Sequence, residues 1–379
     1  MIINRKIAEN VEKTLAQEPK IILLYGPRQA GKTTLLNLIL SKINEQEVVF
    51  LNGDDLRTQE ALSVANLDLL KKTIGSKKFL IIDEAQRISN IGLSLKLLFD
   101  SLGIKIIASG SSSLELASKV NEPLTGRAIT FYLYPIALGE IAPNLPDLSL
   151  RSRLEDFLLF GMYPKVLTTE GDQDKQKYLD DLVNSYLYKD ILSFASVRKP
   201  KKVIDLLSLL ALQIGSEVSI AELASHSALS KQVVEKYLDI LEKMFVIFNL
   251  RGFSRNLRKE IYKTSKYYFW DLGLRNALIR NFNPLNLRQD KGAMLENFFL
   301  MEKLKQNNNT GKFANFYFWR TYDQKEIDFI EEKDGNLFAY EVKWGEKAVK
   351  PPKDWTVNYP NSEFFSVNAE NLMNFFGER

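Results

Sequence analysis

Cysteine is absent from this sequence of 379 residues, and histidine occurs once. The lack of cysteine excludes disulfides and thiolate metal sites, and the single His226 has no partner imidazole, so we expect a structural role for it. Uninterrupted apolar runs are also short, because none approaches the ~18 residues of a membrane span. Residues 1–15 lack the apolar core of a secretory signal. We therefore expect a protein of the reducing cytoplasm with no membrane-spanning segment.

A large excess of one charge is missing as well. The 51 basic and 47 acidic residues leave a net charge of +4, so any binding of nucleic acid must depend on local clusters. Hydrophobic residues make up 45% and charged residues 26%, as in ordinary globular proteins. A chain of this length exceeds what one compact core usually holds, and we expect several domains.

One stretch near the amino terminus has a recognisable chemistry. Residues 21–25 are an apolar run typical of a buried strand, residues 34–40 have helical periodicity, and GPRQAGKT between them fits G-x-x-x-x-G-K-[ST]. Glycines let backbone N–H groups turn toward an anion, and a helix N-terminus adds partial positive charge. We expect Lys32 to reach the β- and γ-phosphates of ATP, and the Thr33 hydroxyl to hold Mg²⁺. The expected nucleotide-binding residues of this loop are Gly26, Arg28, Gln29, Ala30, Gly31, Lys32, Thr33 and Thr34.

A second phosphate-site pattern follows about fifty residues downstream. Four apolar residues, 79–82, precede Asp83 and Glu84, as in a central parallel strand that ends in acidic residues. We expect Asp83 to support Mg²⁺ opposite Thr33, and Glu84 to act as general base on the attacking water. A solvated turn is the alternative for an acidic pair after a strand, and the spacing from the glycine loop favours the phosphate site.

Two further residues of this region are candidates with an open alternative. Residues 104–113 read as an apolar strand with a polar end, in which Ser109 or Ser111 is placed either to sense the γ-phosphate or to cap the next helix. Arg127 directly precedes a strand and either reaches a γ-phosphate, in its own subunit or a neighbour's, or is a surface arginine. The alternation of strands with helices, including a helix over 56–73, predicts a doubly wound parallel sheet.

The middle of the chain is predicted to be mostly helical. Residues 154–192 give helices broken at 161–164, as in a lid, and helices follow at 202–214, after the capping box at Ser219, and at 231–244. Two strand-like segments come next, in the order of a winged helix. Two roles are open for this winged helix: contact with nucleic acid, or service as a protein-interaction or lid module. The residues expected to face phosphates are Lys231, Gln232, Lys236, Arg255, Arg258, Lys259, Lys263 and Lys266.

The last part of the chain places carboxylates and a lysine near one another. An apolar helix carries Glu296, and three strands follow at 315–320, 326–331 and 337–343, with a hairpin turn at Asp334-Gly335. Asp328 lies on the second of these strands and Glu341 with Lys343 on the third, where a spacing of two gives them one face. Carboxylates of this kind hold a divalent metal, and a lysine orients water or offsets phosphodiester charge. A solvated cross-strand charge pair is the alternative.

Taken together, several segments resemble those of a known family: GPRQAGKTTL, LIIDEAQ, SGSSS, LTGR, GMYPKVL, YFWDLGLRNAL, GAMLENF, EIDF and YEVKWG. The chain resembles prokaryotic AAA-like P-loop ATPases that carry a winged helix and a C-terminal domain related to PD-(D/E)xK nucleases. The resemblance implies ATP binding by Gly31, Lys32 and Thr33, with Asp83 supporting Mg²⁺. It also implies a nuclease-like site at Glu296, Asp328, Glu341 and Lys343, with a second divalent metal. Trp344-Gly345 lacks the glutamine or second lysine that some active nucleases have.

The expected architecture is α/β throughout. A P-loop NTPase domain with a parallel sheet flanked by helices spans 1–145, a helical lid 146–200, a winged helix 201–290, and a restriction-endonuclease-like α/β domain 291–379. The leading hypothesis is an ATPase whose nucleotide state controls a metal-dependent nuclease acting on DNA. The alternative is a non-cleaving ATPase switch that binds DNA or protein partners, and a nucleotide kinase is weaker. Homo-oligomerisation is left open.

Overall fold

The computed structural model describes residues 3–111, 116, 119–120, 122–141, 147–187, 199–254, 265–321, 323–345 and 347–376. The chain forms two compact units, Ile2–Pro135 with Lys243–Phe245, and Ile136–Glu242 with Val246–Arg379. Of the boundaries expected from the sequence, only the one at 145/146 lies near the junction of the units. The boundaries at 200/201 and 290/291 fall inside the second unit. In the part of the chain that the structure describes, no helix is long and apolar enough to cross a membrane.

The first unit contains a five-stranded sheet of order β2-β3-β4-β1-β5, in which every neighbouring pair is parallel. Its strands are β1 Ile21–Tyr25, β2 Val48–Asn52, β3 Phe79–Asp83, β4 Lys105–Gly110 and β5 Ala128–Tyr132. All residues of β1 are buried, as expected for an apolar run covered on both faces. The parallel α/β sheet expected from the alternating pattern is therefore confirmed, and β4 lies between the two strands that end in phosphate-site residues.

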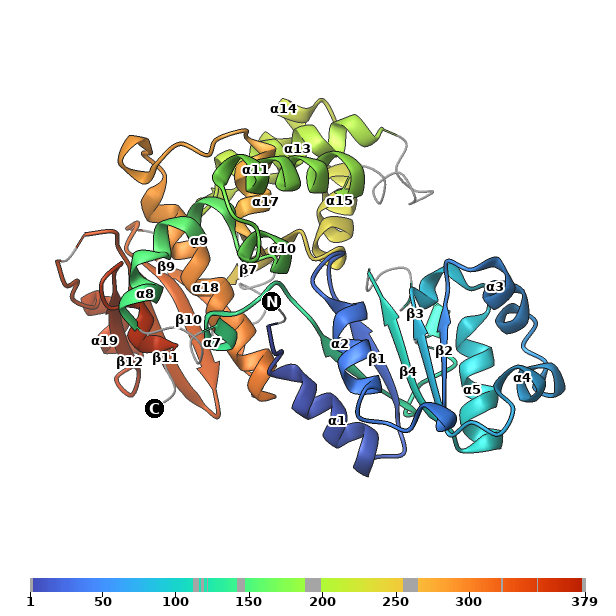
Figure 1. Ribbon diagram of the computed structural model, residues 1–379. Helices are drawn as coiled ribbons and strands as arrows, with labels where there is room; N and C mark the ends of the chain where they lie inside the picture. The colour runs from blue at the N-terminus through green and yellow to red at the C-terminus, as the bar shows by residue number, and fades with distance from the viewer. Residues whose placement is uncertain are drawn as a thin grey trace. The chain divides into compact units, whose positions relative to one another are not determined.

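Helices cover this sheet: α1 Ile7–Gln17, α2 Lys32–Leu40, α3 Leu56–Ser63, α4 Leu67–Ile74 and α5 Ile91–Leu102. One core cluster joins α1 and α2 to the alternate β1 residues Ile22 and Leu24, which share one face of the sheet. Figure 1 shows α3, α4 and α5 gathered beside β2 and β3. The single helix expected over 56–73 is in fact two, because Asn66 accepts hydrogen bonds from the N–H groups of Asp68 and Leu69 and caps a second helix.

The second unit contains a seven-stranded sheet of order β12-β11-β10-β9-β7-β8-β6. Its strands are β6 Glu217–Val218, β7 Ile247–Gly252, β8 Ser265–Phe269, β9 Asn315–Arg320, β10 Glu326–Lys333, β11 Asn336–Val342 and β12 Glu363–Val367. The three strands expected at 315–343 are confirmed, and their hairpin turns through Asp334 and Gly335, which both have positive φ. Parallel pairing of β7 with β9 makes one sheet of the two regions that the sequence divided at 290/291.

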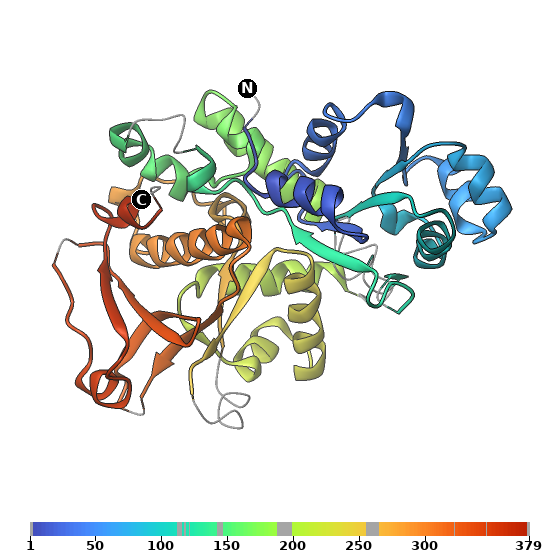
Figure 2. The same ribbon diagram turned by 90° about the horizontal axis from the view of Figure 1, so that it is seen from below.

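The helices of this unit are α7 Leu138–Ile141, α8 Asp147–Ser152, α9 Leu154–Phe160, α10 Pro164–Leu167, α11 Asp172–Asp181, α13 Pro200–Leu212, α14 Ile220–Ser227, α15 Lys231–Lys243, α17 Leu272–Leu278, α18 Lys291–Thr310 and α19 Lys353–Asn358. The Ser219 side chain caps α14, as predicted, by accepting from the N–H of Glu222. Both views show α18 lying along the sheet, and its Phe299 ring contacts the rings of Phe329 and Tyr340 (Figures 1 and 2).

Two of the characteristic sequence segments, GMYPKVL and YFWDLGLRNAL, meet in a buried joint. Gly161 has a positive φ of 78°, and a Cβ there would stand 2.0 Å from the Asp271 carboxylate. That carboxylate accepts from the N–H groups of Met162 and Leu274. Burial raises the pKa of Asp271 above its usual range. The glycine is thus required because an acidic group occupies the space that a side chain would need.

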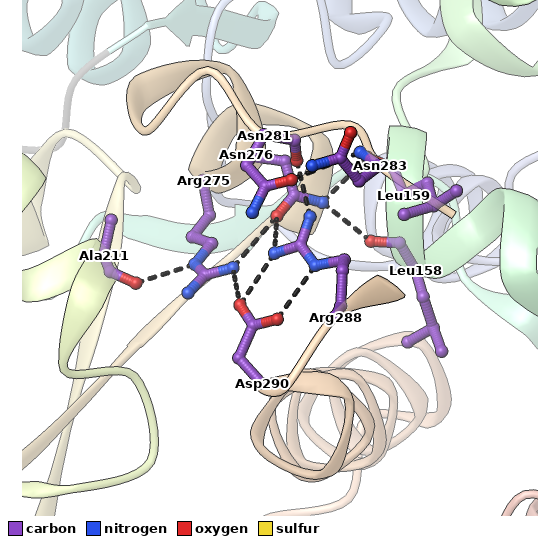
Figure 3. Close-up of polar contacts among 9 residues, drawn as sticks. All are labelled: Leu158, Leu159, Ala211, Arg275, Asn276, Asn281, Asn283, Arg288 and Asp290. Atoms are coloured by element: carbon purple, nitrogen blue, oxygen red, sulfur yellow. Dashed lines mark hydrogen bonds and ion pairs between the residues drawn. The ribbon is translucent and has the colours of Figure 1, made fainter. Parts of the chain in front are cut away.

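A network of polar groups, with the buried side chains of Arg275, Asn276 and Arg288 at its centre, continues from this joint (Figure 3). The Asp290 carboxylate lies between two guanidinium groups, with 2.5 Å to Arg275 Nη1 and 2.7 Å to Arg288 Nη2. Arg275 Nε also donates to the carbonyl of Ala211, and Asn276 donates to the carbonyl of Leu158. These bonds connect α9, α13, α17 and the start of α18. We therefore interpret Arg275 and Asn276 of the segment YFWDLGLRNAL as structural residues.

Candidate functional sites

The glycine loop lies between β1 and α2, and its backbone requires both glycines. A Cβ at Gly26 would stand 2.0 Å from the carbonyl oxygen of Leu133, and Gly31 has a φ of 98°. Lys32 opens α2 with a buried side chain, whose Nζ donates to the carbonyls of Gly26 at 2.8 Å and Pro27 at 3.0 Å. The ammonium therefore lies folded over the loop, where phosphate oxygens could replace the two carbonyl acceptors.

The other residues expected at the loop lie around it. Arg28 is half-buried, Ala30 is buried, and Gln29 and Thr34 are exposed. Gln29 has a positive φ of 59°, so two residues of the loop are left-handed. Sequence reasoning missed Arg5, whose Nη1 donates to the carbonyl of Ala30 at 2.7 Å. Arg5 stands near the amino terminus outside any recognisable motif, so no sequence pattern indicated its contact with the loop.

The structure brings Asp83 to the loop across β4. Thr33 Oγ1 donates to Asp83 Oδ2 at 2.5 Å, and the Ser109 hydroxyl donates to Asp83 Oδ1. The backbone N–H of Glu84 donates to the same oxygen at 3.1 Å. Thr33, Asp83 and Ser109 therefore form one contact group, although they come from three different elements. Sensing of the γ-phosphate by Ser109 remains a prediction.

The pair of Thr33 and Asp83 fits a magnesium site of the kind expected. Mg²⁺ prefers oxygen ligands and is usually bound through one or two carboxylates, with substrate phosphates and water completing its shell. Here the Thr33 hydroxyl is in direct contact with the buried carboxylate of Asp83. The two side-chain groups that donate to Asp83, those of Thr33 and Ser109, are neutral hydroxyls. Hydroxyl donors of this kind orient the carboxylate without cancelling its charge.

Glu84 is held by a residue that sequence reasoning missed. Glu84 has a positive φ of 51°, and its Oε2 accepts from Gln86 Nε2 at 2.5 Å. The same Nε2 donates to the hydroxyl of Ser111 at 3.1 Å, after strand β4. Gly110 makes room for the amide, because a Cβ there would lie 3.0 Å from Gln86 Oε1. Gln86 lies only two residues after Glu84 in the sequence, and this proximity was the available signal for the contact.

Arg127 does not lie at the glycine loop of its own chain. It precedes β5, which pairs in parallel with β1 from Ile21↔Ala128, so it lies beside the first residue of β1. The loop follows Tyr25, at the other end of that strand. The Arg127 side chain is exposed and its Nε lies 2.8 Å from Asp100 Oδ1. The expectation that Arg127 reaches a γ-phosphate in its own subunit is therefore wrong, and action on a neighbouring subunit remains a prediction.

In the second unit the expected carboxylates and lysine do come together. Strand pairing sets Asp328 on β10 beside Glu341 on β11, and Asp328 Oδ2 accepts from the N–H of Val342 at 2.9 Å. Lys343 Nζ lies 2.8 Å from Glu341 Oε1 and 3.3 Å from Asp328 Oδ2. The predicted face shared by Glu341 and Lys343 is thus observed. We call Glu296, Glu326, Asp328 and Glu341 the carboxylate cluster.

Lys266 enters this cluster from β8, and sequence reasoning placed it wrongly. It was expected to face nucleic-acid phosphates, but it is 1% exposed. Its Nζ forms an ion pair with Glu326 and lies 3.5 Å from Glu296 Oε1. Tyr268, two residues on and therefore on the same face of β8, donates its hydroxyl to Glu296. Strand alternation thus turns Lys266 into the protein interior.

The remaining basic residues expected at phosphates divide into two groups. Lys231, Gln232 and Lys236 are exposed on α15, as expected. Glu235 and Asp239 are exposed on the same helix, so this surface is mixed in charge. Four residues lie outside the described residues: Arg255, Arg258, Lys259 and Lys263.

Burial and mutual repulsion perturb the ionisation of the cluster. Burial first, and the charge of Asp328 second, raise the pKa of Glu296 to about 8, although Lys266 opposes the shift. The same two causes raise the pKa of Glu341. Burial lowers the pKa of Lys343, but Asp328 and Glu341 outweigh it and leave this pKa above its usual range. Too much negative charge is therefore gathered here for every carboxyl group to ionise at its ordinary pKa.

The three-carboxylate metal site expected at Glu296, Asp328 and Glu341 is not formed. Among the residues that the structure describes, no group of three or more histidine or acidic side chains is arranged to hold a metal ion. The physical reason is that ammonium groups stand among the carboxylates, with Lys266 between Glu296 and Glu326 and Lys343 between Asp328 and Glu341. The side chains are therefore arranged as ion pairs.

Comparison with protein families divides the chain into three matches. A family described as an AAA domain matches residues 18–142, which include the glycine loop and the Asp83-Glu84 pair. Domains of unknown function match residues 151–285 (DUF8612) and residues 291–356 (DUF4143). The first match supports a nucleotide-binding P-loop ATPase domain of the AAA type in the first unit.

Curated relatives extend over most of the chain. The sequence is 28% identical over 370 residues to the uncharacterized protein MJ1544 of Methanocaldococcus jannaschii, covering 89% of this chain and 81% of that protein. It is 28% identical over 350 residues to the uncharacterized protein Rv2008c of Mycobacterium tuberculosis, covering 90% and 74%. The combination of both units in one chain thus recurs in an archaeon and a bacterium.

Solved structures overlap only in part. AMPPCP-bound DnaA from Aquifex aeolicus is 18% identical, with a TM-score of 0.30, and covers 62% of this chain and 86% of that one. The Pif1 helicase from Candida albicans is 17% identical, with a TM-score of 0.29, and covers 48% of each chain. Scores this low describe limited overlap of the two backbones.

Proposed function

We propose that the first unit binds ATP with Mg²⁺ and hydrolyses it, and that the nucleotide state regulates the second unit. The observation that carries this proposal is the contact of Thr33 with Asp83 beside Lys32 and Glu84. Loop residues, a metal-supporting pair and a general base are thereby gathered at the carboxyl ends of two parallel strands. Mg²⁺, when bound, would neutralise charge on the β- and γ-phosphates.

Each side chain has a definite task in this proposal. Lys32 exchanges its two carbonyl acceptors for phosphate oxygens, and the backbone N–H groups of the loop complete the cradle. Thr33 and Asp83 would hold the metal through their oxygen atoms. Glu84 accepts the proton of the attacking water, and Gln86 keeps the Glu84 carboxylate in place.

The test separates binding from hydrolysis. Glu84→Gln keeps the shape of the side chain but removes the base, so ATP binding should persist while steady-state hydrolysis falls by about a hundredfold or more. Glu60→Gln, on exposed α3, is the matched control and should leave both unchanged. Full hydrolysis by Glu84→Gln protein would contradict the assigned role of this residue.

For the second unit we propose binding of nucleic acid through a winged helix. The supporting observation is the order of α13, β6, α14, α15, β7 and β8, with β8 paired to both other strands. Lys231 and Lys236 on exposed α15 would neutralise phosphates. Replacing both with alanine should weaken binding to duplex DNA and reduce its salt dependence. Unchanged binding and salt dependence would argue for the alternative, a protein partner.

Two activities compete for the carboxylate cluster, namely DNA cleavage controlled by ATP and binding without cleavage. The ammonium groups among the carboxylates favour binding without cleavage. A phosphodiesterase assay with Mg²⁺ or Mn²⁺, with and without ATP, distinguishes them, because cleavage should be lost in the Asp328→Ala/Lys343→Ala protein. If the original chain cleaves DNA and the double substitution abolishes this cleavage, the nuclease hypothesis is supported.

A further inference from the structure

A short segment at the end of α15 belongs to the first unit, although the chain on either side of it belongs to the second. This segment is Lys243–Phe245, and it groups with Ile2–Pro135. Phe245 is buried, and the centre of its ring lies 5.9 Å from those of Tyr132 and Tyr134, at interplanar angles of 64° and 74°. Edge-to-face pairs of this kind are favourable beyond the area that they bury. The connection between α15 and β7 is therefore packed within the first unit.

The backbone of Phe245 is unusual for an aromatic residue. Its φ is 59°, in the left-handed region. The N–H of Val246 donates to the carbonyl of Leu241 at 3.0 Å, which is the bond that closes a helix end when a left-handed residue follows. Glycine usually occupies that position, because it adopts positive φ without strain. The turn alone therefore does not explain why a bulky ring stands here.

The ring partners of Phe245 lie in Tyr132–Tyr134, a segment that contacts the start of the glycine loop. Tyr132 is the register partner of Tyr25, which directly precedes Gly26. Between the two tyrosines, Leu133 donates its N–H to the carbonyl of Tyr25 at 2.7 Å. The carbonyl of Leu133 also fills the space that a Cβ at Gly26 would need. A displacement at the start of the loop therefore displaces this segment.

Arg5 connects the same segment to the middle of the loop. Its buried guanidinium donates to the carbonyls of Ala30 at 2.7 Å and Tyr134 at 2.6 Å. The Tyr25 hydroxyl is buried as well and, among the described residues, has no hydrogen-bond partner. A buried hydroxyl without a partner and an aromatic residue with a left-handed backbone both raise the energy of this arrangement. Two such features beside one loop are expected of an element that has a second arrangement.

We propose that the Phe245 ring transmits the nucleotide state of the glycine loop to the second unit. Phosphate binding around Gly26 and Ala30 shifts Tyr132 and Tyr134, and the ring that is packed against them follows. Because Phe245 lies between α15 and β7, its movement changes the end of that helix and the start of that strand. The inference rests on the proposed regulation by nucleotide and assigns the residue that carries it.

The experiment is hydrogen–deuterium exchange of the full chain, measured by mass spectrometry without nucleotide and with AMPPCP and Mg²⁺. In the parent, AMPPCP should change the exchange rates at the end of α15 and in β7 by about threefold or more. Phe245→Gly keeps the left-handed turn and removes the ring. This variant should bind AMPPCP with a Kd within about threefold of the parent and should lose the change at α15 and β7.

The matched control is Ala228→Gly. Ala228 follows α14 with a φ of 53° and is exposed, so this substitution relaxes a left-handed position without removing a packed ring. Its response to AMPPCP should equal that of the parent. A full response in Phe245→Gly would overturn the inference and leave regulation by nucleotide intact. Absence of any response in the parent, despite measured binding of AMPPCP, would overturn the regulation itself and the inference with it.

Two further results test the role of Phe245 if Phe245→Gly does not fold. Tyr132→Leu, on the edge strand β5, removes one ring partner and should weaken the response of α15 and β7 while AMPPCP still binds. The parent also distinguishes a second route, because the segment after Pro135 is held on α18, where the N–H of Leu138 donates to Glu302 at 2.6 Å. A parent response in α18 with none in β7, or an undiminished response in Tyr132→Leu, would overturn the inference.

Discussion

The two units hold their acidic residues in opposite ways. In the first unit, Asp83 accepts from the hydroxyls of Thr33 and Ser109, which are neutral. In the second unit, Asp328 and Glu341 meet the ammonium of Lys343, and Glu296 meets that of Lys266. Hydroxyl donors orient a carboxylate and leave its charge for an incoming cation, whereas an ammonium cancels it. The sequence motifs of both sites contain acidic residues, but only the donor type distinguishes an available carboxylate from a compensated one.

The largest difference between the two units should appear when one carboxylate in each is replaced with an amide. Asp83→Asn removes the charge that supports Mg²⁺ and should reduce ATP hydrolysis by about a hundredfold or more. Asp328→Asn, the equivalent change in the second unit, should leave hydrolysis within about twofold of the parent. Steady-state phosphate release measures both. A comparable loss in Asp328→Asn would show that the cluster takes part in hydrolysis.

A smaller effect is expected at Gln86, whose Nε2 donates a hydrogen bond to the Glu84 carboxylate. Gln86→Ala frees the carboxylate to rotate and should lower kcat about tenfold while the Kd for ATP stays the same. Gln46→Ala, on an exposed segment, is the control. Since Gln86 is a positioning residue, an equal change in kcat and ATP affinity would indicate general damage to the site.

The cluster should also make stability depend on pH. The pKa of Glu296 is raised to about 8 in the folded protein from 4.5, so the folded state retains a proton that the unfolded chain loses. Stability from this group is full below pH 4.5 and is lost as pH rises toward 8. Glu296→Gln should therefore gain roughly 3–4 kcal/mol in free energy of unfolding, relative to the parent, between pH 5 and pH 8.5.

Urea unfolding followed by tryptophan fluorescence gives this difference. Glu370→Gln, which alters an exposed carboxylate of the same unit, should show no such pH dependence. If the difference between parent and Glu296→Gln stays constant from pH 5 to 8.5, Glu296 does not hold the additional proton.

The smallest effect is expected at Arg127, whose exposed side chain pairs with Asp100 away from the loop. Arg127→Ala should leave ATP hydrolysis at low protein concentration unchanged. Loss of hydrolysis with retained ATP binding, and recovery on mixing with Glu84→Gln protein, would instead show that Arg127 acts on a neighbouring subunit.

The sequence was most informative where chemistry is local. The glycine loop and Asp83-Glu84 each lie within a short segment, and the ends of β9 follow directly from its residue pattern. Lys266 could not be placed in the same way, because its partners Glu296 and Glu326 come from elements far along the chain. Arg5 and Gln86 were missed for a related reason: a contact with a carbonyl or a carboxylate leaves no periodic pattern. The pairing of β7 with β9 was likewise hidden, because a parallel pair needs a long connection rather than a recognisable turn.

The β7–β9 pairing also decides which pieces of this protein can be inherited separately. A gene fragment that begins at residue 291 would encode β9 without β7, and its open strand edge would invite association with other chains. The same fragment would lack Lys266 and leave Glu296 and Glu326 without their common ammonium. Recombination that exchanges this region between relatives should therefore include both β7 and β8, because β7 covers the edge of β9 and β8 supplies Lys266.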